Sequence, residues 1–147
     1  MEKKDQTLEE MEKDDNSHYQ PVLESADATP VYKQIGDSVS MHLNIYYPKD
    51  HTSGDPKPVV IYFFSGGFVQ GSPIQWEETC KYLASRGMVA ITADYRVISR
   101  NGGNAINCVV DAKSAVRYVR ETRCRNAYRP GTCGCSRRFC GGLLANR

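Results

Sequence analysis

The feature that most constrains the fold of this chain is an unbroken apolar run, "PVVIYFF", at residues 58–64. The run has the length of a strand, and apolar residues at successive positions are typical of a strand covered on both faces, as in a parallel sheet flanked by helices. A helical segment at 73–87, a second buried strand at 88–96 and another helical segment at 105–121 follow it. Strand and helix alternating at these lengths predict βαβ units and a parallel sheet.

The first helical segment carries start and stop signals. Ser72 stands at the N-cap position, Pro73 at the first helical position, and Gly87 directly after the last periodic residue. Cys80 and Cys108 fall within the amphipathic patterns of the two helical segments. A small apolar core residue is the expected role of a cysteine in such a pattern, ahead of a redox role.

Residues 31–50 predict an antiparallel hairpin. Apolar and polar residues alternate on both sides of Gly36-Asp37, which is typical of two strands joined by a tight turn. The predicted fold class is therefore α/β, with an antiparallel hairpin followed by parallel βαβ units. We expect this partial domain to span residues 30–121.

The N-terminal region differs from the rest in its charge. The first seventeen residues carry seven acidic and three basic side chains and almost nothing apolar. Such a composition predicts a polar, disordered leader, which we extend over residues 1–29. The leader lacks the apolar stretch of a secretion signal and no run reaches the length of a membrane span, so we expect a cytoplasmic protein that does not contact a membrane. The net charge of +2 is too small to favour a nucleic-acid partner.

The glycines that follow the apolar strand are the candidate site. Gly66 and Gly67 come directly after it, where ligands collect in open parallel sheets. Because glycine has no Cβ, its backbone N–H group can face a cavity, and two such groups could hold an oxyanion during acyl transfer. A plain tight turn is the alternative interpretation of a Gly-Gly pair.

The blocks "KPVVIYFFSGGFVQGSP", "YLASRGMVAITADYRV" and "CVVDAKSAVRYVRE" occur in an order that resembles the N-terminal half of an α/β-hydrolase of the esterase and lipase type, similar to bacterial acetyl-xylan and feruloyl esterase-like proteins. The resemblance runs from about Val31 to Glu121. It implies serine-dependent hydrolysis of a carboxylic ester through an acyl-enzyme, without a cofactor or metal. The implied substrate is a small-molecule or polysaccharide-linked ester, and members of such families can be secreted.

The resemblance also assigns the oxyanion hole. The family loop reads His-Gly-Gly-Gly, and two of its backbone N–H groups help to form the hole. Here the same places hold Phe64-Ser65-Gly66-Gly67, so the resemblance carries over Gly66 and Gly67 but not the histidine that anchors the loop.

The family would next require a Gly-x-Ser-x-Gly elbow that presents the nucleophile. The resemblance places this serine at Phe139, which has no nucleophilic atom. The histidines His18, His42 and His51 all precede the parallel strands, whereas the family's acid and histidine follow the elbow. We therefore expect a truncated fragment that lacks the catalytic serine, acid and histidine and is inactive as given.

Residues 122–140 form an aberrant segment with five arginines and four cysteines. The segment contains no Leu, Ile, Val, Met, Lys, Asp or Glu. The resemblance stops near Glu121 and resumes at residues 141–147, which look like a remnant of the helix after the elbow. One codon choice for residues 128–141, read one base later, encodes Ile-Asp-Pro-Glu-Arg-Ala-Ala-Ala-Ala-Gly-Gly-Ser-Ala-Gly. This observation favours a frameshift across the nucleophile elbow.

Three other interpretations of the segment remain open. Four thiolates could bind zinc, although paired Cys-x2-4-Cys spacing is absent; they belong to Cys124, Cys133, Cys135 and Cys140. The arginines and Tyr128 could contact nucleic acid, although no fold signature surrounds them. The segment could also be a plain disordered tail. The alternative function is thus a non-catalytic zinc- or nucleic-acid-binding module fused to a partial α/β domain.

Overall fold

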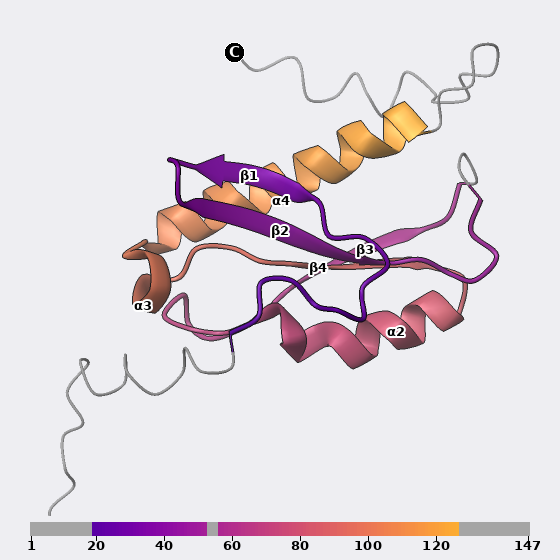
Figure 1. Ribbon diagram of the computed structural model, residues 1–147, viewed down its shortest axis with the longest axis horizontal. Coiled ribbons are helices and arrows are strands. Elements are labelled where there is room, and N and C mark those ends of the chain that lie inside the picture. Colours follow the sequence, from indigo (N-terminus) through magenta and orange to yellow (C-terminus); the bar gives the residue numbers. More distant parts are fainter. Residues whose placement is uncertain (1–18, 53–55, 127–147) are drawn as a thin grey trace, which may run out of the picture.

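The computed structural model describes residues 19–52 and 56–126, with side chains to Thr122 (Figure 1). Four strands form one mixed sheet in the order β1-β2-β4-β3. The elements are β1 (Val31–Ile35), β2 (Val39–Tyr46), β3 (Val59–Phe63), the 3-10 helix η2 (Pro73–Trp76), α2 (Glu77–Ser85), β4 (Val89–Ala93), α3 (Ile98–Asn101) and α4 (Ala105–Asn126).

The predicted hairpin and the predicted parallel unit are both present. β1 and β2 pair antiparallel, and the turn between them contains Gly36 with a φ of 59°. β3 and β4 pair in parallel, with η2 and α2 between them in the chain. β2 joins the two parts by pairing antiparallel with β4. The α/β fold class is therefore confirmed.

Helices cover both faces of the sheet, as Figure 1 shows for α2 and α4. The alternation of side chains along β4 explains this arrangement, because successive residues point to opposite faces. Ala90 packs in a cluster with Cys80 and Ala84 of α2, whereas Ile91 packs in a cluster with Ala115 of α4. All five residues of β4 are buried.

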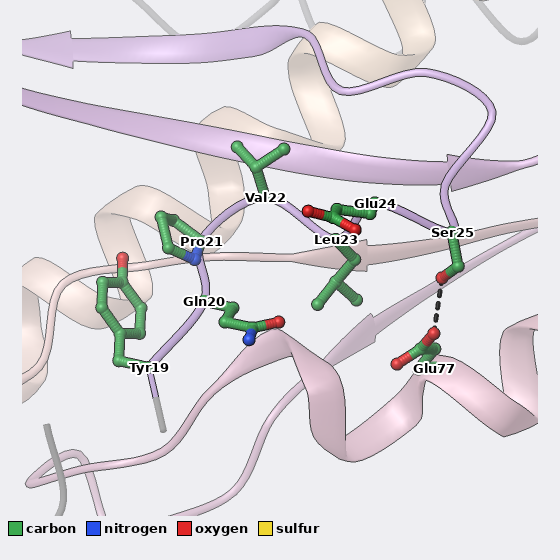
Figure 2. Close-up of a pocket in the computed structure, with 8 residues that line it drawn as sticks. All are labelled: Tyr19, Gln20, Pro21, Val22, Leu23, Glu24, Ser25 and Glu77. Carbon is green, nitrogen blue, oxygen red and sulfur yellow. Dashed lines mark hydrogen bonds between the residues drawn. The ribbon is translucent and has the colours of Figure 1, made fainter. Parts of the chain in front are cut away.

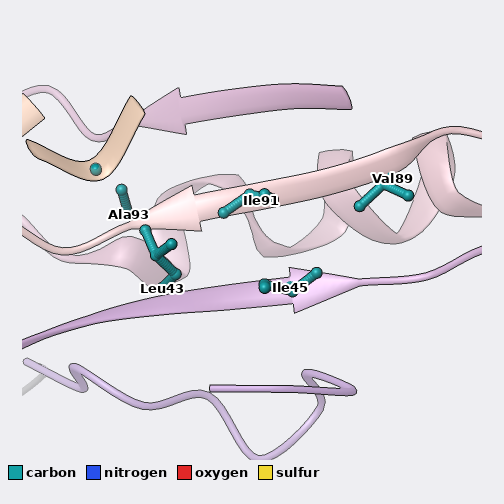
Figure 3. Packing of buried hydrophobic residues seen from close by; sticks show 6 residues of the cluster. Leu43, Ile45, Val89, Ile91 and Ala93 are labelled. Atoms are coloured by element: carbon teal, nitrogen blue, oxygen red, sulfur yellow. The ribbon is translucent and has the colours of Figure 1, made fainter. Parts of the chain in front are cut away.

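The larger core cluster lies on the face of the sheet that packs against α4, and Figure 3 shows its side chains from β2 and β4. It combines side chains of β2 and β4 with one alanine of α4, and its members are Leu43, Ile45, Val89, Ile91, Ala93 and Ala115. Burying a large aliphatic side chain stabilises a fold by roughly 1.5–3 kcal/mol, so this cluster is the main support of the sheet.

β3 is less buried than its sequence predicts. Its five residues are all half-buried, whereas those of β4 are all buried. Within the described residues β3 pairs only with β4 and forms one edge of the sheet. An unbroken apolar run therefore marks the strand type correctly but does not distinguish a central strand from an edge strand.

The signals at the first helix behave as expected only in part. Pro73 begins the helical region and Gly87 ends it with a φ of 88°. Ser72 has extended backbone angles, but its side chain caps no helix N–H group; its Oγ instead accepts a hydrogen bond from the N–H of Gln20 at 3.4 Å. Cys80 and Cys108 are both buried, as expected.

The prediction of a disordered leader is wrong for its last part. Leu23 is only 2% exposed, and its backbone N–H donates to Asn44 Oδ1 at 2.8 Å. Asn44 Nδ2 donates in turn to the Pro21 carbonyl at 3.1 Å, and Ala28 forms a bridge with Ile45. The buried side-chain amide of Asn44 on β2 thus holds this segment in place through two hydrogen bonds. The polar composition of the segment gives no sign of these contacts. Residues 1–18 lie outside the described part.

The last helix is longer than predicted. α4 ends at Asn126 and not at Glu121, so it takes in the first residues of the segment at 122–140. Residues 127–147, which include Phe139 and the segment 141–147, lie outside the described residues, and the domain boundaries proposed there stay predictions. Among the described residues, no helix combines the length and the apolar character needed to cross a membrane.

Candidate functional site

The candidate site is the glycine loop, residues 64–71, which follows the carboxyl end of β3. Four of its residues have a positive φ: 152° at Gly66, 63° at Gly67, 67° at Phe68 and 127° at Gly71. Such angles suit glycine but cost a residue with a Cβ on the order of 1–2 kcal/mol. The strain at Phe68 therefore requires that the surroundings fix the loop.

The N–H groups of Gly66 and Gly67 are neighbouring donors that make no hydrogen bond within the described residues. The Gly66 carbonyl, in contrast, accepts hydrogen bonds from Val69 N at 3.0 Å and Gln70 N at 3.3 Å. The Gly66 carbonyl therefore bonds within the loop, whereas the N–H groups of Gly66 and Gly67 are left to bind a ligand. Two adjacent backbone donors are the arrangement that stabilises an oxyanion.

Phe64, where the sequence resemblance would place a histidine, is held by Tyr95. The two rings stack with their centroids 4.1 Å apart, and the Tyr95 hydroxyl donates to the Phe64 carbonyl at 2.6 Å. Both residues are nearly inaccessible to solvent. The loop is therefore anchored without an imidazole, by aromatic stacking and one hydrogen bond from the segment after β4.

The helical segment η2 holds the start of the loop. Gln75 Oε1 accepts a hydrogen bond from Ser65 N at 2.7 Å, and Trp76 Nε1 donates to the Phe63 carbonyl at 3.1 Å. These two bonds fix the backbone on either side of Phe64. The sequence offers no short-range pattern for them, because both partners follow in the next element.

The helix α3 holds the far side of the loop through its first backbone donors. Ile98 N donates to the Phe68 carbonyl and Ser99 N donates to the Val69 carbonyl, each at 3.0 Å. These bonds fix two successive carbonyl groups, at Phe68 and at the residue after it, and so sustain the unfavourable φ of Phe68.

Substitution of Gly66 tests the geometry of the loop. A Cβ at Gly66 would lie 1.9 Å from the Gln70 carbonyl oxygen, whereas a Cβ at Gly67 would meet nothing within 4 Å. We expect Gly67→Ala to lower the free energy of unfolding by about 1 kcal/mol, from its φ alone, and Gly66→Ala to lower it by about 2–3 kcal/mol. Urea unfolding of the two variants measures the difference. Equal losses would contradict the backbone contact between Gly66 and Gln70.

Two cavities border these elements. An apolar cavity of about 270 Å³ lies against the glycine loop and α4, lined by Phe63, Phe64, Phe68, Tyr95, Cys108, Val109 and Ala112. A larger, more polar one of about 600 Å³ is formed by residues 19–25 and Glu77 (Figure 2). The smaller cavity is the relevant one for the site, because it shares residues with the loop.

The larger cavity contains a serine but no activated nucleophile. Ser25 Oγ donates to Glu77 Oε1 at 2.5 Å and lies 3.1 Å from the Tyr46 hydroxyl oxygen, as Figure 2 shows for the first contact. A hydrogen bond from Lys81 lowers the pKa of Glu77, so this carboxylate is a weak base. Such a partner orients the hydroxyl without activating it.

Asp94, at the end of β4, lies in a buried polar cluster. Its side chain is fully buried, and Tyr19 Oη donates to Asp94 Oδ2 at 2.5 Å. Burial raises the pKa of Asp94 to about 6, against the lowering effects of the Tyr19 hydrogen bond and the charge of Arg100. Burial and the neighbouring Asp94 also raise the pKa of Tyr19, so its hydroxyl stays protonated.

Asp111 of α4 forms a second buried cluster with two cations. It accepts hydrogen bonds from Arg96 Nε at 2.8 Å, Arg96 Nη2 at 2.9 Å and Lys33 Nζ at 2.6 Å. Burial would raise the pKa of Asp111, but these hydrogen bonds outweigh it and lower the pKa below its ordinary value. The ion pairs tie β1, the end of β4 and α4 together.

The described histidines lie away from these contacts. His51 stacks on Tyr47 with ring centroids 4.7 Å apart, and His42 lies on β2 with its Nδ1 buried and without a hydrogen-bond partner. Neither makes a hydrogen bond or ring contact with the glycine loop in the described part of the chain, and His18 and Phe139 lie outside it. Residues 19–52 and 56–126 hold no group of three or more metal-binding side chains.

The sequence predicts the two glycines as site residues but does not identify the residues that hold their loop. The signals were present in part, because Asp94, Tyr95 and Arg96 are three polar or aromatic residues directly after a buried strand. Asp94 contacts Tyr19 and Tyr95 contacts Phe64, which lie 75 and 31 positions away in the chain, and no local pattern connects them. Arg96 bonds Asp111, 15 positions further along the chain.

Comparison with known proteins gives consistent results. A sequence model of the carboxylesterase family matches residues 7–99. The chain is 32% identical over 78 residues to esterase LipI of Mycobacterium tuberculosis, covering 52% of this chain and 24% of that protein. It is 36% identical over 67 residues to the neuroligin-like protein glit-1 of Caenorhabditis elegans, covering 45% of this chain and 9% of that protein.

Solved structures of a thermophilic esterase from Thermogutta terrifontis, Est2, are also similar. The native form matches with a TM-score of 0.69 and 40% identity, over 78% of this chain and 41% of that chain. The propionate-bound form matches with a TM-score of 0.65 and 44% identity, over 70% of this chain and 38% of that chain. The chain therefore spans less than half of the length of each of these relatives.

Proposed function

The chain belongs to the carboxylesterase family, and we propose that its glycine loop forms the oxyanion hole of a serine-dependent carboxylic ester hydrolase. The observation that carries the proposal is the pair of adjacent N–H groups at Gly66 and Gly67, which have no partner among the described residues. They follow β3, in a chain that is 40% identical to a solved esterase over 78% of its own length. The family's ester substrates are the substrate class that this assignment implies.

The proposed chemistry needs charge stabilisation from these two groups. When a serine attacks an ester carbonyl, the carbonyl oxygen becomes an oxyanion, and donors fixed before the reaction stabilise it without reorganisation. Removing one donor of such a hole costs about 100- to 1000-fold in kcat. The anchors at Tyr95, Gln75 and α3 supply the required rigidity, because they fix the loop on three sides.

A chimera tests this role directly. We propose to replace the matching part of the Thermogutta terrifontis esterase with residues 19–126 and to measure hydrolysis of p-nitrophenyl butyrate. The chimera is expected to turn over this ester, and Gly66→Ala to lower its kcat at least about 100-fold, through displacement of the donors. Gly87→Ala is the matched control, since Gly87 also has a positive φ but ends α2. Equal effects of the two substitutions would refute the oxyanion assignment.

Residues 1–147 by themselves are expected to be inactive. The proposed nucleophile position holds Phe139, and the sequence contains no histidine after His51 to act as a base. We predict no hydrolysis of p-nitrophenyl acetate above the buffer rate. Saturable turnover that disappears on Gly66→Pro would show that another residue of this chain performs the chemistry.

We also propose that the segment at 122–140 is the nucleophile elbow translated in the wrong reading frame. The shifted codon reading supports this, because it places Gly-Gly-Ser-Ala-Gly where the family has its elbow. The nucleotide sequence across codons 120–147, determined independently, decides it. A codon series that cannot encode the shifted peptide would eliminate the frameshift.

A further inference from the structure

We propose that Arg100 is a positioning residue that fixes the glycine loop, and that Asp94 and Tyr19 hold Arg100 in place. The inference rests on the proposed function of the loop, because it concerns how the donors of Gly66 and Gly67 are oriented. Arg100 touches neither donor, so its role is exerted through the backbone of the loop.

Arg100 reaches the loop from α3 and is itself enclosed. Its side chain is 8% exposed, and its Nη1 donates a hydrogen bond to the carbonyl of Gly71, the last residue of the loop. The guanidinium carbon lies 3.7 Å from the centroid of the Tyr19 ring and 5.6 Å from that of the Phe64 ring. The cation therefore contacts aromatic rings from residue 19 and from the first residue of the loop.

Asp94 and Tyr19 complete the support of this cation. Arg100 Nη2 lies 3.6 Å from Asp94 Oδ1, which is an ion pair but too long for a hydrogen bond. Tyr19 places its ring on the guanidinium and its hydroxyl on Asp94 Oδ2. Within the described residues Arg100 Nε and Nη2 have no hydrogen-bond partner, so ring stacking, charge and the Gly71 contact define where the guanidinium lies.

The two ends of the loop are in direct contact, which lets Arg100 act on its middle. A Cβ at Gly71 would lie 2.5 Å from Phe64 Cδ2, so the last residue of the loop packs directly against the ring of the first. Tyr95 holds the Phe64 carbonyl and Arg100 holds the Gly71 carbonyl, and both come from the short segment after β4. Gly66 and Gly67 lie between these fixed ends, so the two contacts set the direction of their N–H groups.

Amide hydrogen exchange of the full chain, followed by NMR, tests the proposal without any ester. The reporter is the Val69 amide, which donates to the Gly66 carbonyl within the loop, and the reference is the Ile91 amide of the interior strand β4. We expect Arg100→Met to accelerate exchange at Val69 about tenfold or more, the factor that corresponds to the loss of one charge-assisted hydrogen bond, and to leave Ile91 within about twofold.

Two further substitutions and one control refine the test. Arg100→Lys keeps the charge but loses the planar fork, so a smaller acceleration at Val69 is expected. Tyr19→Phe keeps the ring on the guanidinium and removes the bond to Asp94, and it gives an informative variant if Arg100→Met does not fold. Arg117→Met, at an exposed position of α4, is expected to change neither amide.

The NMR amide signals of Gly66 and Gly67 report directly on the two proposed donors. They would not change if Arg100 only contributed to the overall stability of the fold. Their nitrogen shifts are expected to change in Arg100→Met and Tyr19→Phe but not in Arg117→Met. Acceleration of Val69 and Ile91 by the same factor, or unchanged glycine signals, would overturn the proposal. Because no substrate takes part, these outcomes are independent of whether the chimera hydrolyses an ester.

Discussion

Replacement of Asp111 by alanine is expected to lower the free energy of unfolding by about 3–5 kcal/mol, the usual cost of breaking a buried ion pair from one side. Asp111 is fully buried and bonds both Arg96 and Lys33, whose side chains are 17% and 23% exposed. Without the carboxylate, two largely covered cations would lose their common partner. Since whole domains are stable by only about 5–15 kcal/mol, this single change would remove a large part of the stability.

Urea unfolding followed by circular dichroism measures this loss, and a surface ion pair provides the matched control. Asp50 bonds Lys57 at 3.1 Å, but its side chain is 73% exposed. Asp50→Ala is therefore expected to leave the unfolding midpoint unchanged, because exposed pairs contribute little. If Asp111→Ala and Asp50→Ala shifted the midpoint equally, the network of Asp111 would not be what joins α4 to the sheet.

Much of the sheet follows from local sequence patterns. The alternation around Gly36-Asp37 predicts the hairpin, because alternating residues indicate a strand with one buried face. The strand-length segments at 58–64 and 88–96, each followed by a helical pattern, predict the parallel pair. The positions of Gly66 and Gly67 after β3 follow from the same reasoning. These features depend on residues that are close in the sequence, so local patterns are sufficient to predict them.

The remaining features depend on contacts between distant residues. Pairing of β2 with β4 makes both of them interior strands of the described sheet, and no pattern within either strand specifies that order. Tyr19 belongs to a polar segment that looks disordered by composition, yet its hydroxyl bonds Asp94, which follows it by 75 positions. The anchoring of the glycine loop could not be predicted for the same reason, since Tyr95 and Arg100 reach it across the fold.

The buried carboxyl of Asp94 is expected to make the chain less stable at neutral pH than near pH 4. Its pKa is about 6 in the folded chain, against an ordinary value of 3.8, mainly because burial disfavours the charged form. Between these two values the folded chain keeps a proton that the unfolded chain has released. Stability therefore falls as the pH rises through this window, by about 3 kcal/mol in total, and no further above it.

Comparison of the wild type with Asp94→Asn isolates this contribution. The asparagine of this variant cannot ionise, so the difference in unfolding free energy between the two proteins is expected to change by about 3 kcal/mol between pH 4 and pH 7, in favour of the variant at pH 7. Tyr19, Arg100 and His42 act on Asp94 in the folded chain and are present in both proteins. Asp111 contributes with the opposite sign, because its pKa is lowered and its stabilisation is lost only as the pH falls below the ordinary range.

Parallel stability curves for the wild type and Asp94→Asn would show that Asp94 does not titrate in this window. A carboxylate whose ionisation costs stability at neutral pH needs another reason to occupy a fully buried position. Its contacts with Tyr19 and Arg100 supply one, since Arg100 holds the Gly71 carbonyl. Asp94→Asn should therefore be more stable relative to the wild type at pH 7 than at pH 4, while its Val69 amide exchanges faster relative to Ile91, which links the cost of the buried charge to the order of the glycine loop.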